Sequence, residues 1–293
     1  MSESPRVGLS TYNITTAELL DIAQAADRAG FDSLWLGEHV VLPWGYGSVH
    51  PAHQGEEGRQ AAEPYAQIIE PSTELIDPCV ALAGAATVTT RIKLATGIYL
   101  LPLRHPLMTA RAAATLDGLS GGRFMLGVGS GWLREEFEAL SVPYAERGQL
   151  YEESLEVLRA AFQGGPFHYS GKQFQTGEVQ VSPHQVQVPL VLGGNSDRAL
   201  RRAVQLADAW FSSGTPSFEE AVRLRDRLEY FRVQCGRTEP LPAYFRVPGA
   251  DLDVVERYLA EGMDKLIYWV QNLSPPGTDR HETLRQAASA LGL

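Results

Sequence analysis

A glutamate and a histidine stand directly after a short apolar run, and they are the side chains best suited to acid–base chemistry. The run Ser33–Gly37 (SLWLG) is followed at once by Glu38 and His39. An unperturbed imidazole has a pKa of about 6.5, so it can take up and release a proton near neutral pH. We expect Glu38 to orient His39 or to fix its tautomer, and Trp44 to offer a ring for stacking on a planar ligand. The alternative is that His39 only packs under the loop that follows.

A glycine-rich run, LSGGRFMLGVGSGW at residues 119–132, raises the question of a nucleotide loop. It is not a dinucleotide fingerprint, which needs Gly-x-Gly-x-x-Gly directly after a strand and an acidic residue about 20 positions later. Glycines at the end of a strand remove side chains, so a flat ring can approach the backbone. The alternative is tight-turn chemistry alone. The residues at this strand end are Gly129, Ser130, Gly131 and Trp132.

A second glycine group, LGGNSDRALRRA from Leu192, follows an apolar run and opens a helix. The backbone N–H groups of Gly194, Asn195 and Ser196 would face an anion, with the positive end of the helix dipole behind them. Three arginines nearby raise the local positive potential. The pattern predicts a phosphate site, and the alternative is that Asn195 or Ser196 is an ordinary helix N-cap.

Metal binding is not predicted. His50-x-x-His53 could supply two ligands, but no third ligand has a suitable spacing. Cys79 and Cys235 are far apart and lie outside any metal-ligand spacing, so we expect two small buried side chains.

These residues must be positioned by a fold in which short apolar runs alternate with helical patterns. The runs lack polar alternation, which indicates strands buried on both faces of a parallel sheet. Eight such units predict an α/β fold, a (β/α)8 TIM barrel. The expected strands are Val7–Ser10, Ser33–Gly37, Lys93–Ile98, Arg123–Val128, Pro189–Gly194, Asp208–Ser213, Tyr244–Val247 and Lys265–Val270.

The expected barrel is a single domain over residues 1–293 with two insertions. The connection at about 38–76 begins at the C-terminal mouth of the barrel, where catalytic loops sit, and we interpret it as a lid rather than a passive insertion. Ser-Gly and Thr-Gly pairs predict a small hairpin at about 167–181. Thr15 and Glu18 have the spacing of a capping box.

Composition limits the partners. The formal charge of −10 disfavours nucleic acid. No apolar run approaches the roughly 20 residues that span a bilayer, and no signal peptide precedes the first strand. We therefore expect a cytoplasmic protein, a homodimer, that acts on a small-molecule substrate without nucleic acid or membrane.

At this point the sequence resembles a known family. GFDSLWLGEHVVLP, the stretch from KLATGIYL to VPYAERG, and PLVLGGNSDRALRRAVQLADAW are similar to the luciferase-like monooxygenase superfamily, and within it to the predicted coenzyme F420-dependent oxidoreductases. The similarity runs from about Val7 to Phe211. The motifs Leu-Ser-Gly-Gly-Arg and Gly-Val-Gly-x-Gly-Trp are specific for the superfamily, but they do not separate F420 from FMN.

The resemblance implies a deazaflavin or flavin lying across the barrel mouth. It places a non-prolyl cis peptide, in a bulge that supports the central ring, at Gly97 and Ile98. It places the phosphate site at Gly193 and Gly194, and the acid–base or ring-facing histidine at His39.

The sequence departs from related enzymes at two positions, and the resemblance leaves two activities to consider. Trp132 stands where F420-dependent sugar-phosphate dehydrogenases have an acidic proton donor, which argues against that reaction. Trp44 lies one residue later than the tryptophan of those enzymes. We expect an F420-dependent oxidoreductase that moves a hydride between the deazaflavin C5 and a small organic substrate. The alternative is an FMN-dependent monooxygenase using reduced flavin and O2.

Overall fold

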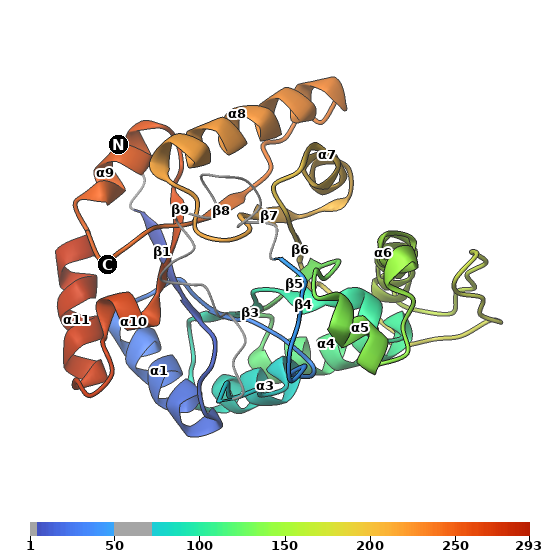
Figure 1. Ribbon diagram of the computed structural model, residues 1–293, viewed down its shortest axis with the longest axis horizontal. Helices are drawn as coiled ribbons and strands as arrows, with labels where there is room; N and C mark the ends of the chain where they lie inside the picture. The colour runs from blue at the N-terminus through green and yellow to red at the C-terminus, as the bar shows by residue number, and fades with distance from the viewer. Residues whose placement is uncertain (1–4, 50–71) are drawn as a thin grey trace.

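The strands form one closed parallel barrel surrounded by helices (Figure 1). The computed structural model describes residues 5–49 and 72–293. The strand order is β3-β2-β1-β9-β8-β7-β6-β5-β4, and pairing of β3 with β5 closes the ring. The strands are β1 (Arg6–Thr11), β2 (Ser33–Leu36), β3 (Lys93–Thr96), β4 (Tyr99–Leu100), β5 (Phe124–Gly129), β6 (Leu190–Gly193), β7 (Ala209–Phe211), β8 (Ala243–Arg246) and β9 (Lys265–Trp269).

The predicted (β/α)8 barrel is confirmed, with one change in the third strand. The expected strand Lys93–Ile98 is interrupted: β3 ends at Thr96, and β4 begins at Tyr99. Both pieces pair with β5, through Ala95 with Met125 and through Tyr99 with Val128. They therefore share one of the eight positions of the barrel wall.

Helices cover the outside of the barrel, as Figure 1 shows. They are α1 (Thr16–Ala29), α3 (Pro78–Val88), α4 (Pro106–Ser120), α5 (Arg134–Ala139), α6 (Arg147–Phe162), α7 (Asp197–Leu206), α8 (Phe218–Gln234), α9 (Val254–Ala260), α10 (Val270–Leu273) and α11 (Arg280–Leu291). The predicted capping box of Thr15 and Glu18 starts α1. The expectation of two buried cysteines is wrong for Cys235, because this residue is exposed where α8 ends, whereas Cys79 is half-buried.

The interior of the barrel is filled by side chains from its strands. Trp35 is fully buried there; its ring stacks on Phe211 with centroids 4.7 Å apart and packs against Tyr244 at 4.8 Å. A side chain on Gly97 would meet Trp35 at 3.1 Å, so this glycine makes room for the indole. Because the lumen is closed by these rings, a ligand can only lie above them, at the mouth formed by the carboxyl ends of the strands.

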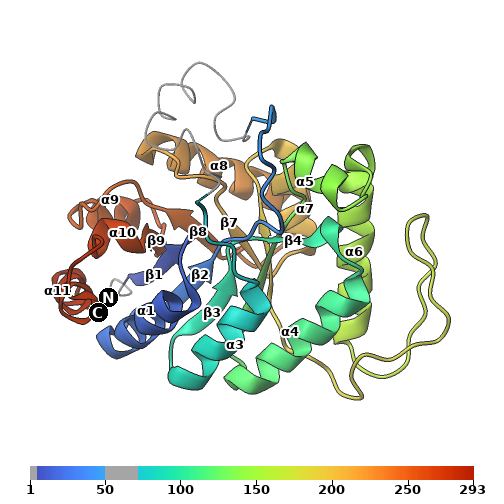
Figure 2. The ribbon, with the colours of Figure 1, turned by 60° about the horizontal axis from the view of Figure 1, so that its bottom comes forward.

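Between α6 and β6 the chain leaves the barrel as an arm, which projects beyond α6 in Figure 2. Antiparallel bridges pair Phe167 with Val179 and Ser170 with Gln175. These bridges fall within the range where the sequence predicts a hairpin insertion.

Candidate active site

At the mouth, His39 is hydrogen-bonded to a carboxylate that the sequence did not single out. Its Nδ1 lies 3.1 Å from Oε2 of Glu136, and the two side chains are 6% and 0% exposed. His39 follows β2, whereas Glu136 belongs to α5, the short helix after β5. Parallel strands end at one rim, so residues 97 positions apart meet there.

The contacts of the second oxygen of Glu136 indicate which nitrogen of His39 carries the proton. Oε1 accepts hydrogen bonds from the backbone N–H of Val40 and, at 3.4 Å, of Val41. With both carboxylate oxygens acting as acceptors, the Nδ1 of His39 is the donor and carries the ring proton. The Nε2 atom is then the nitrogen that can exchange a proton with a ligand.

Aromatic rings enclose the imidazole. Tyr12 and Trp132 stand edge-on to His39, with ring centroids 6.1 and 5.8 Å away. Tyr46 in turn stands edge-on to Trp132 at 6.1 Å. Burial, and then the charge of Glu136, raises the pKa of Tyr12 well above its ordinary range, so its phenol stays protonated at neutral pH.

The prediction that Glu38 orients His39 is wrong. Its Oε1 lies 2.6 Å from Nη2 of Arg104, and its Oε2 accepts the backbone N–H of Leu100 at 2.7 Å. Burial raises the pKa of Glu38, and the guanidinium of Arg104 opposes that effect. Glu38 therefore links the end of β2 to β4, next to residues 97–98. The carboxylate that is hydrogen-bonded to His39, as was expected of Glu38, is that of Glu136.

Trp44 does not join the cluster around His39, because its side chain is 91% exposed. The indole beside the imidazole is that of Trp132. The remainder of the expected lid, residues 50–71 with His50 and His53, lies outside the described residues. In the ranges 5–49 and 72–293 no three potential metal ligands come together.

The floor of the mouth is formed where β4, β5 and β6 end. The peptide bond between Gly97 and Ile98 is cis, as the resemblance predicts. A side chain on Gly129 would lie 2.0 Å from Cδ1 of Ile98, and one on Gly193 would lie 3.4 Å from it. Ile98 thus occupies the space that Gly129 leaves free, which corrects the expectation that a cofactor ring uses that space.

Gly131 also makes room for a neighbour within the protein. It has a φ of +75°, and a side chain there would lie 2.7 Å from the Phe137 ring. Ser130 and Trp132 flank it at the end of β5. These glycines shape the floor by close packing, so what a ligand meets there includes the half-buried side chain of Ile98.

The second glycine group connects β6 to α7 in a loop anchored on the next strand. Gly194 has a φ of +116°, and a side chain there would lie 2.8 Å from Cβ of Ala199. The side chain of Asn195 donates to the carbonyl of Ser213 at 3.0 Å and accepts its N–H at 2.8 Å. Ser196 caps α7 through the N–H of Ala199. Gly193 and Gly194 have no side chains to cover their backbone, and the indole N–H of Trp210 donates to the carbonyl of Gly194 at 2.8 Å.

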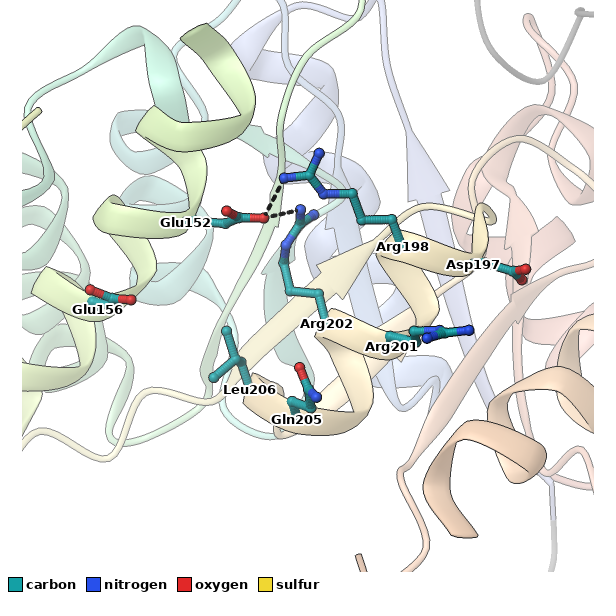
Figure 3. A pocket seen from close by; sticks show the side chains of 8 residues that line it. All are labelled: Glu152, Glu156, Asp197, Arg198, Arg201, Arg202, Gln205 and Leu206. Carbon is teal, nitrogen blue, oxygen red and sulfur yellow. Dashed lines mark hydrogen bonds and ion pairs between the residues drawn. The ribbon is translucent and has the colours of Figure 1, made fainter. Parts of the chain in front are cut away.

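Two of the arginines of α7 are held by a carboxylate of α6 rather than facing this loop. Arg198 and Arg202 both bind Oε1 of Glu152, at 2.9 and 2.6 Å, and point toward it from α7 in Figure 3. Asp197 pairs with Arg227. The groove between α6 and α7, of about 520 Å³, holds three arginines and three carboxylates; its lining is Glu152, Glu156, Asp197, Arg198, Arg201, Arg202, Gln205 and Leu206.

A buried arginine that sequence analysis missed ends β8 at the mouth. Arg246 is 6% exposed, and its guanidinium lies 4.9 Å from the Phe211 ring centroid and 4.2 Å from that of Trp269. Its Nη2 donates to Oγ of Ser10 at 3.0 Å. A charged residue inside the apolar run Tyr244–Val247 was the available signal, because a charge within a buried strand is rare unless it is paired.

The fold and the residues at its mouth define a parallel (β/α)8 barrel with a buried histidine–carboxylate pair where the strands end, and comparison with known proteins gives its family. Residues 2–254 match the family described as "Luciferase-like monooxygenase". The chain belongs to this family.

An uncharacterized protein of Mycobacterium tuberculosis is 30% identical over 251 residues, covering 85% of this chain and 83% of that protein. The F420-dependent tetrahydromethanopterin reductase of Methanopyrus kandleri has a similar fold, with a TM-score of 0.72, 18% identity and coverage of 98% of both chains. The oxygenating constituent of 3,6-diketocamphane monooxygenase of Pseudomonas putida, in complex with FMN, has a TM-score of 0.64 and 20% identity, over 88% of this chain and 72% of that chain.

No helix in the described part of the chain is long and apolar enough to cross a bilayer.

Proposed function

We propose that this protein is an F420-dependent oxidoreductase that transfers a hydride between the deazaflavin C5 and a small organic substrate. The observation that carries the proposal is the buried His39–Glu136 pair at the mouth, beside the floor formed by Ile98. Hydride transfer to or from a carbon–oxygen or conjugated carbon bond needs a matching proton transfer, which a histidine oriented by a carboxylate can perform.

The residues at the mouth fit a planar ring with a phosphate-bearing chain. Ile98 gives an apolar surface between β5 and β6 on which a ring can lie. Gly193 and Gly194 give a backbone without side chains at the start of α7, where N–H groups and the helix dipole favour an anion. Gly194 cannot carry a side chain without contact with Ala199, so the open backbone is built into the loop.

The charge around the backbone of Gly193 and Gly194, which we call the glycine cradle, favours F420 over FMN. The phosphate of F420 is a diester with one negative charge, whereas a phosphate monoester such as that of FMN carries about 1.5 to 2 negative charges near pH 7. Arg198 and Arg202 share the single carboxylate of Glu152, and α7 begins with the carboxylate of Asp197. A site made of backbone N–H groups, with both of these arginines already held by Glu152, suits the lower charge.

The chain's own residues would act as follows. A bound deazaflavin supplies or accepts the hydride at C5. His39 exchanges a proton with the substrate at Nε2, while Nδ1–H remains on Glu136 and keeps the ring in one orientation. Trp132 and Tyr46 cover the imidazole and exclude water from it. The backbone of Gly193 and Gly194 holds the phosphate.

The test is a titration of the purified protein with F420 and with FMN, followed by quenching of tryptophan fluorescence. We expect F420 to bind about ten-fold or more tightly than FMN, because Arg198 and Arg202 are already held by Glu152 and are not placed to balance a second phosphate charge. Tight FMN binding without F420 binding would replace this proposal by the FMN-dependent monooxygenase, for which the FMN-bound structural relative provides the precedent.

A further inference from the structure

Tyr12, whose ring stands edge-on to His39, carries a buried hydroxyl that pairs with none of the described residues. Tyr12 follows β1, so it lies at the same mouth as His39. A side chain on Gly37 would lie 3.3 Å from Cδ2 of Tyr12, so the tyrosine ring packs over the backbone at the end of β2. Its ring meets the imidazole edge-on at 6.1 Å. The packing of Tyr12 is therefore set by the two strands that also position His39.

The hydroxyl of Tyr12 is buried and has no hydrogen-bond partner among the described residues. Leaving a buried hydroxyl unpaired costs roughly 1–3 kcal/mol, so such groups are rare and call for an explanation. Two other buried tyrosines are paired: the hydroxyl of Tyr151 donates to the carbonyl of Val128 at 3.2 Å, and that of Tyr268 donates to the carbonyl of Asp251 at 3.0 Å. The hydroxyl of Tyr258 also lacks a partner among the described residues, but it belongs to α9, whereas Tyr12 lies beside the proposed proton-transfer group.

We propose that the Tyr12 hydroxyl and Nε2 of His39 bind the same oxygen atom of the substrate, so that the substrate is a carbonyl compound or the corresponding alcohol. This inference rests on the proposed function. The Tyr12 hydroxyl has no partner among the described residues, the hydrogen bond of His39 to Glu136 uses Nδ1 and not Nε2, and the two rings stand edge-on at the mouth. One oxygen placed between them would satisfy both, as neighbouring donors do in an oxyanion site.

The reaction balances with these groups. In the reducing direction the carbonyl carbon gains a hydride with its two electrons, and the carbon–oxygen π bond breaks. The oxygen takes the proton of the imidazolium Nε2, which leaves neutral His39 bound to Glu136. Tyr12 keeps its proton and donates a hydrogen bond to the oxygen as negative charge develops there. In the oxidising direction the alcohol proton would pass to Nε2, the carbon–oxygen π bond would form, and the hydride with its two electrons would go from the carbon to oxidised F420, the acceptor that the proposed function supplies.

The variant Tyr12→Phe separates a ligand-binding role from a structural one. Its hydroxyl pairs with none of the described residues, so its removal should leave the Tm unchanged or slightly higher. Tyr258→Phe is the matched control, because it also removes a buried hydroxyl without a partner among the described residues, but from α9 in the outer layer. A fall in Tm confined to Tyr12→Phe would indicate a structural hydroxyl and overturn the proposal.

Binding is measured without cofactor, using cyclohexanone and methylenecyclohexane, which has the same ring but no oxygen. In ligand-observed NMR titrations we expect Tyr12→Phe to weaken cyclohexanone binding about ten-fold, because one hydrogen bond is lost, and to leave methylenecyclohexane binding unchanged. Tyr258→Phe should match the parent protein with both. Equal affinity of parent and Tyr12→Phe for cyclohexanone, or a parent protein that does not prefer it over methylenecyclohexane, would overturn the proposal.

A kinetic measurement with reduced F420 and cyclohexanone separates this proposal from the proposed function. Tyr12→Phe should lower kcat about ten-fold or more, with F420 affinity within two-fold of the parent, because the hydroxyl acts on the substrate oxygen. An unchanged kcat would remove Tyr12 from the reaction while leaving the F420 assignment intact. Absence of F420 binding to the parent would instead overturn the proposed function, and the cofactor-free titrations would still decide the role of Tyr12.

Discussion

Two carboxylates on neighbouring helices, Glu136 and Glu152, are both paired with basic side chains, yet their surroundings differ. The Glu136 side chain is 0% exposed and holds His39 inside the barrel mouth. The Glu152 side chain is 40% exposed and is shared by Arg198 and Arg202 on the outside of the barrel. The first pair leaves the Nε2 atom of His39 for a ligand, whereas in the second group the two guanidinium groups are both engaged by the one carboxylate.

The difference shows why a groove with many charged side chains is not necessarily a site. In the α6–α7 groove the ion pairs join two helices and face water, so each contributes little. At the mouth, a buried pair, a tyrosine hydroxyl and an apolar floor come from separate strands and converge on one place. Buried polar groups that lie close together and lack hydrogen-bond partners indicate a catalytic site better than a groove of exposed ion pairs does.

The largest effect is expected at the start of α7, the helix that follows the glycine pair at the barrel mouth and also lines the α6–α7 groove. Gly194→Asp should weaken F420 binding about 10³-fold, because a carboxylate would face the phosphate and its Cβ would press on Ala199. The measurement is the fluorescence titration with F420 and FMN. Gly165→Asp is the control, since this glycine also has a positive φ but has no neighbour within 4 Å of a Cβ. Unchanged affinity in Gly194→Asp would mean that the glycine pair is only a turn.

The histidine of the mouth should come next. His39→Ala should lower kcat about 10²-fold while leaving F420 affinity within a few-fold, because the imidazole exchanges the proton but does not hold the cofactor. Initial rates with reduced F420 and a ketone or enone acceptor measure it. Full activity in this variant would remove His39 from the mechanism.

A smaller effect is expected for the partner of that histidine. Glu136→Gln should lower kcat about ten-fold, because the amide can present its NH2 group to Nδ1 and shift the ring to the other tautomer. Glu138→Gln, on an exposed position of the same helix, is the control. If both variants had the same kcat, Glu136 would be a packing residue and the contrast with Glu152 would disappear.

The smallest effect belongs to the groove. Burial opposes ionisation of Glu152, but hydrogen bonds from Arg202 and Arg198 outweigh it and lower the pKa of Glu152. Its contribution to stability is therefore present above the unfolded pKa of about 4.3 and is lost as the pH falls further. Glu152→Gln should cost about 1 kcal/mol or less at pH 7 and less at pH 3 than at pH 7, by urea unfolding. A change in F420 affinity would show that the groove takes part in binding.

Much of the fold could be predicted because its signals are local. Thr15 and Glu18 cap α1, Asp77 caps α3 before Pro78, and apolar runs mark the strands. The split between β3 and β4 could not be located from periodicity alone, since Lys93–Ile98 has the length and composition of one short strand. The cis bond at Gly97 came from the family resemblance, not from periodicity.

The site could be predicted only in part, for a different reason. His39 and the glycine cradle lie next to strand ends, which the sequence marks. Glu136 could not be paired with His39 because the two are far apart in sequence and Glu38 is adjacent to the histidine, which made it the more obvious partner. Tyr12 could not be recognised either, because an unpaired hydroxyl is visible only once all its neighbours are placed.

The most direct test of the central claim is a crystal structure of the protein with F420 bound. We predict that the deazaflavin ring lies in van der Waals contact with Ile98 on the side facing His39, and that the phosphate accepts hydrogen bonds from the backbone around Gly193 and Gly194. A ring placed in the α6–α7 groove, or a phosphate held by Arg198 and Arg202 after displacement of Glu152, would contradict the account.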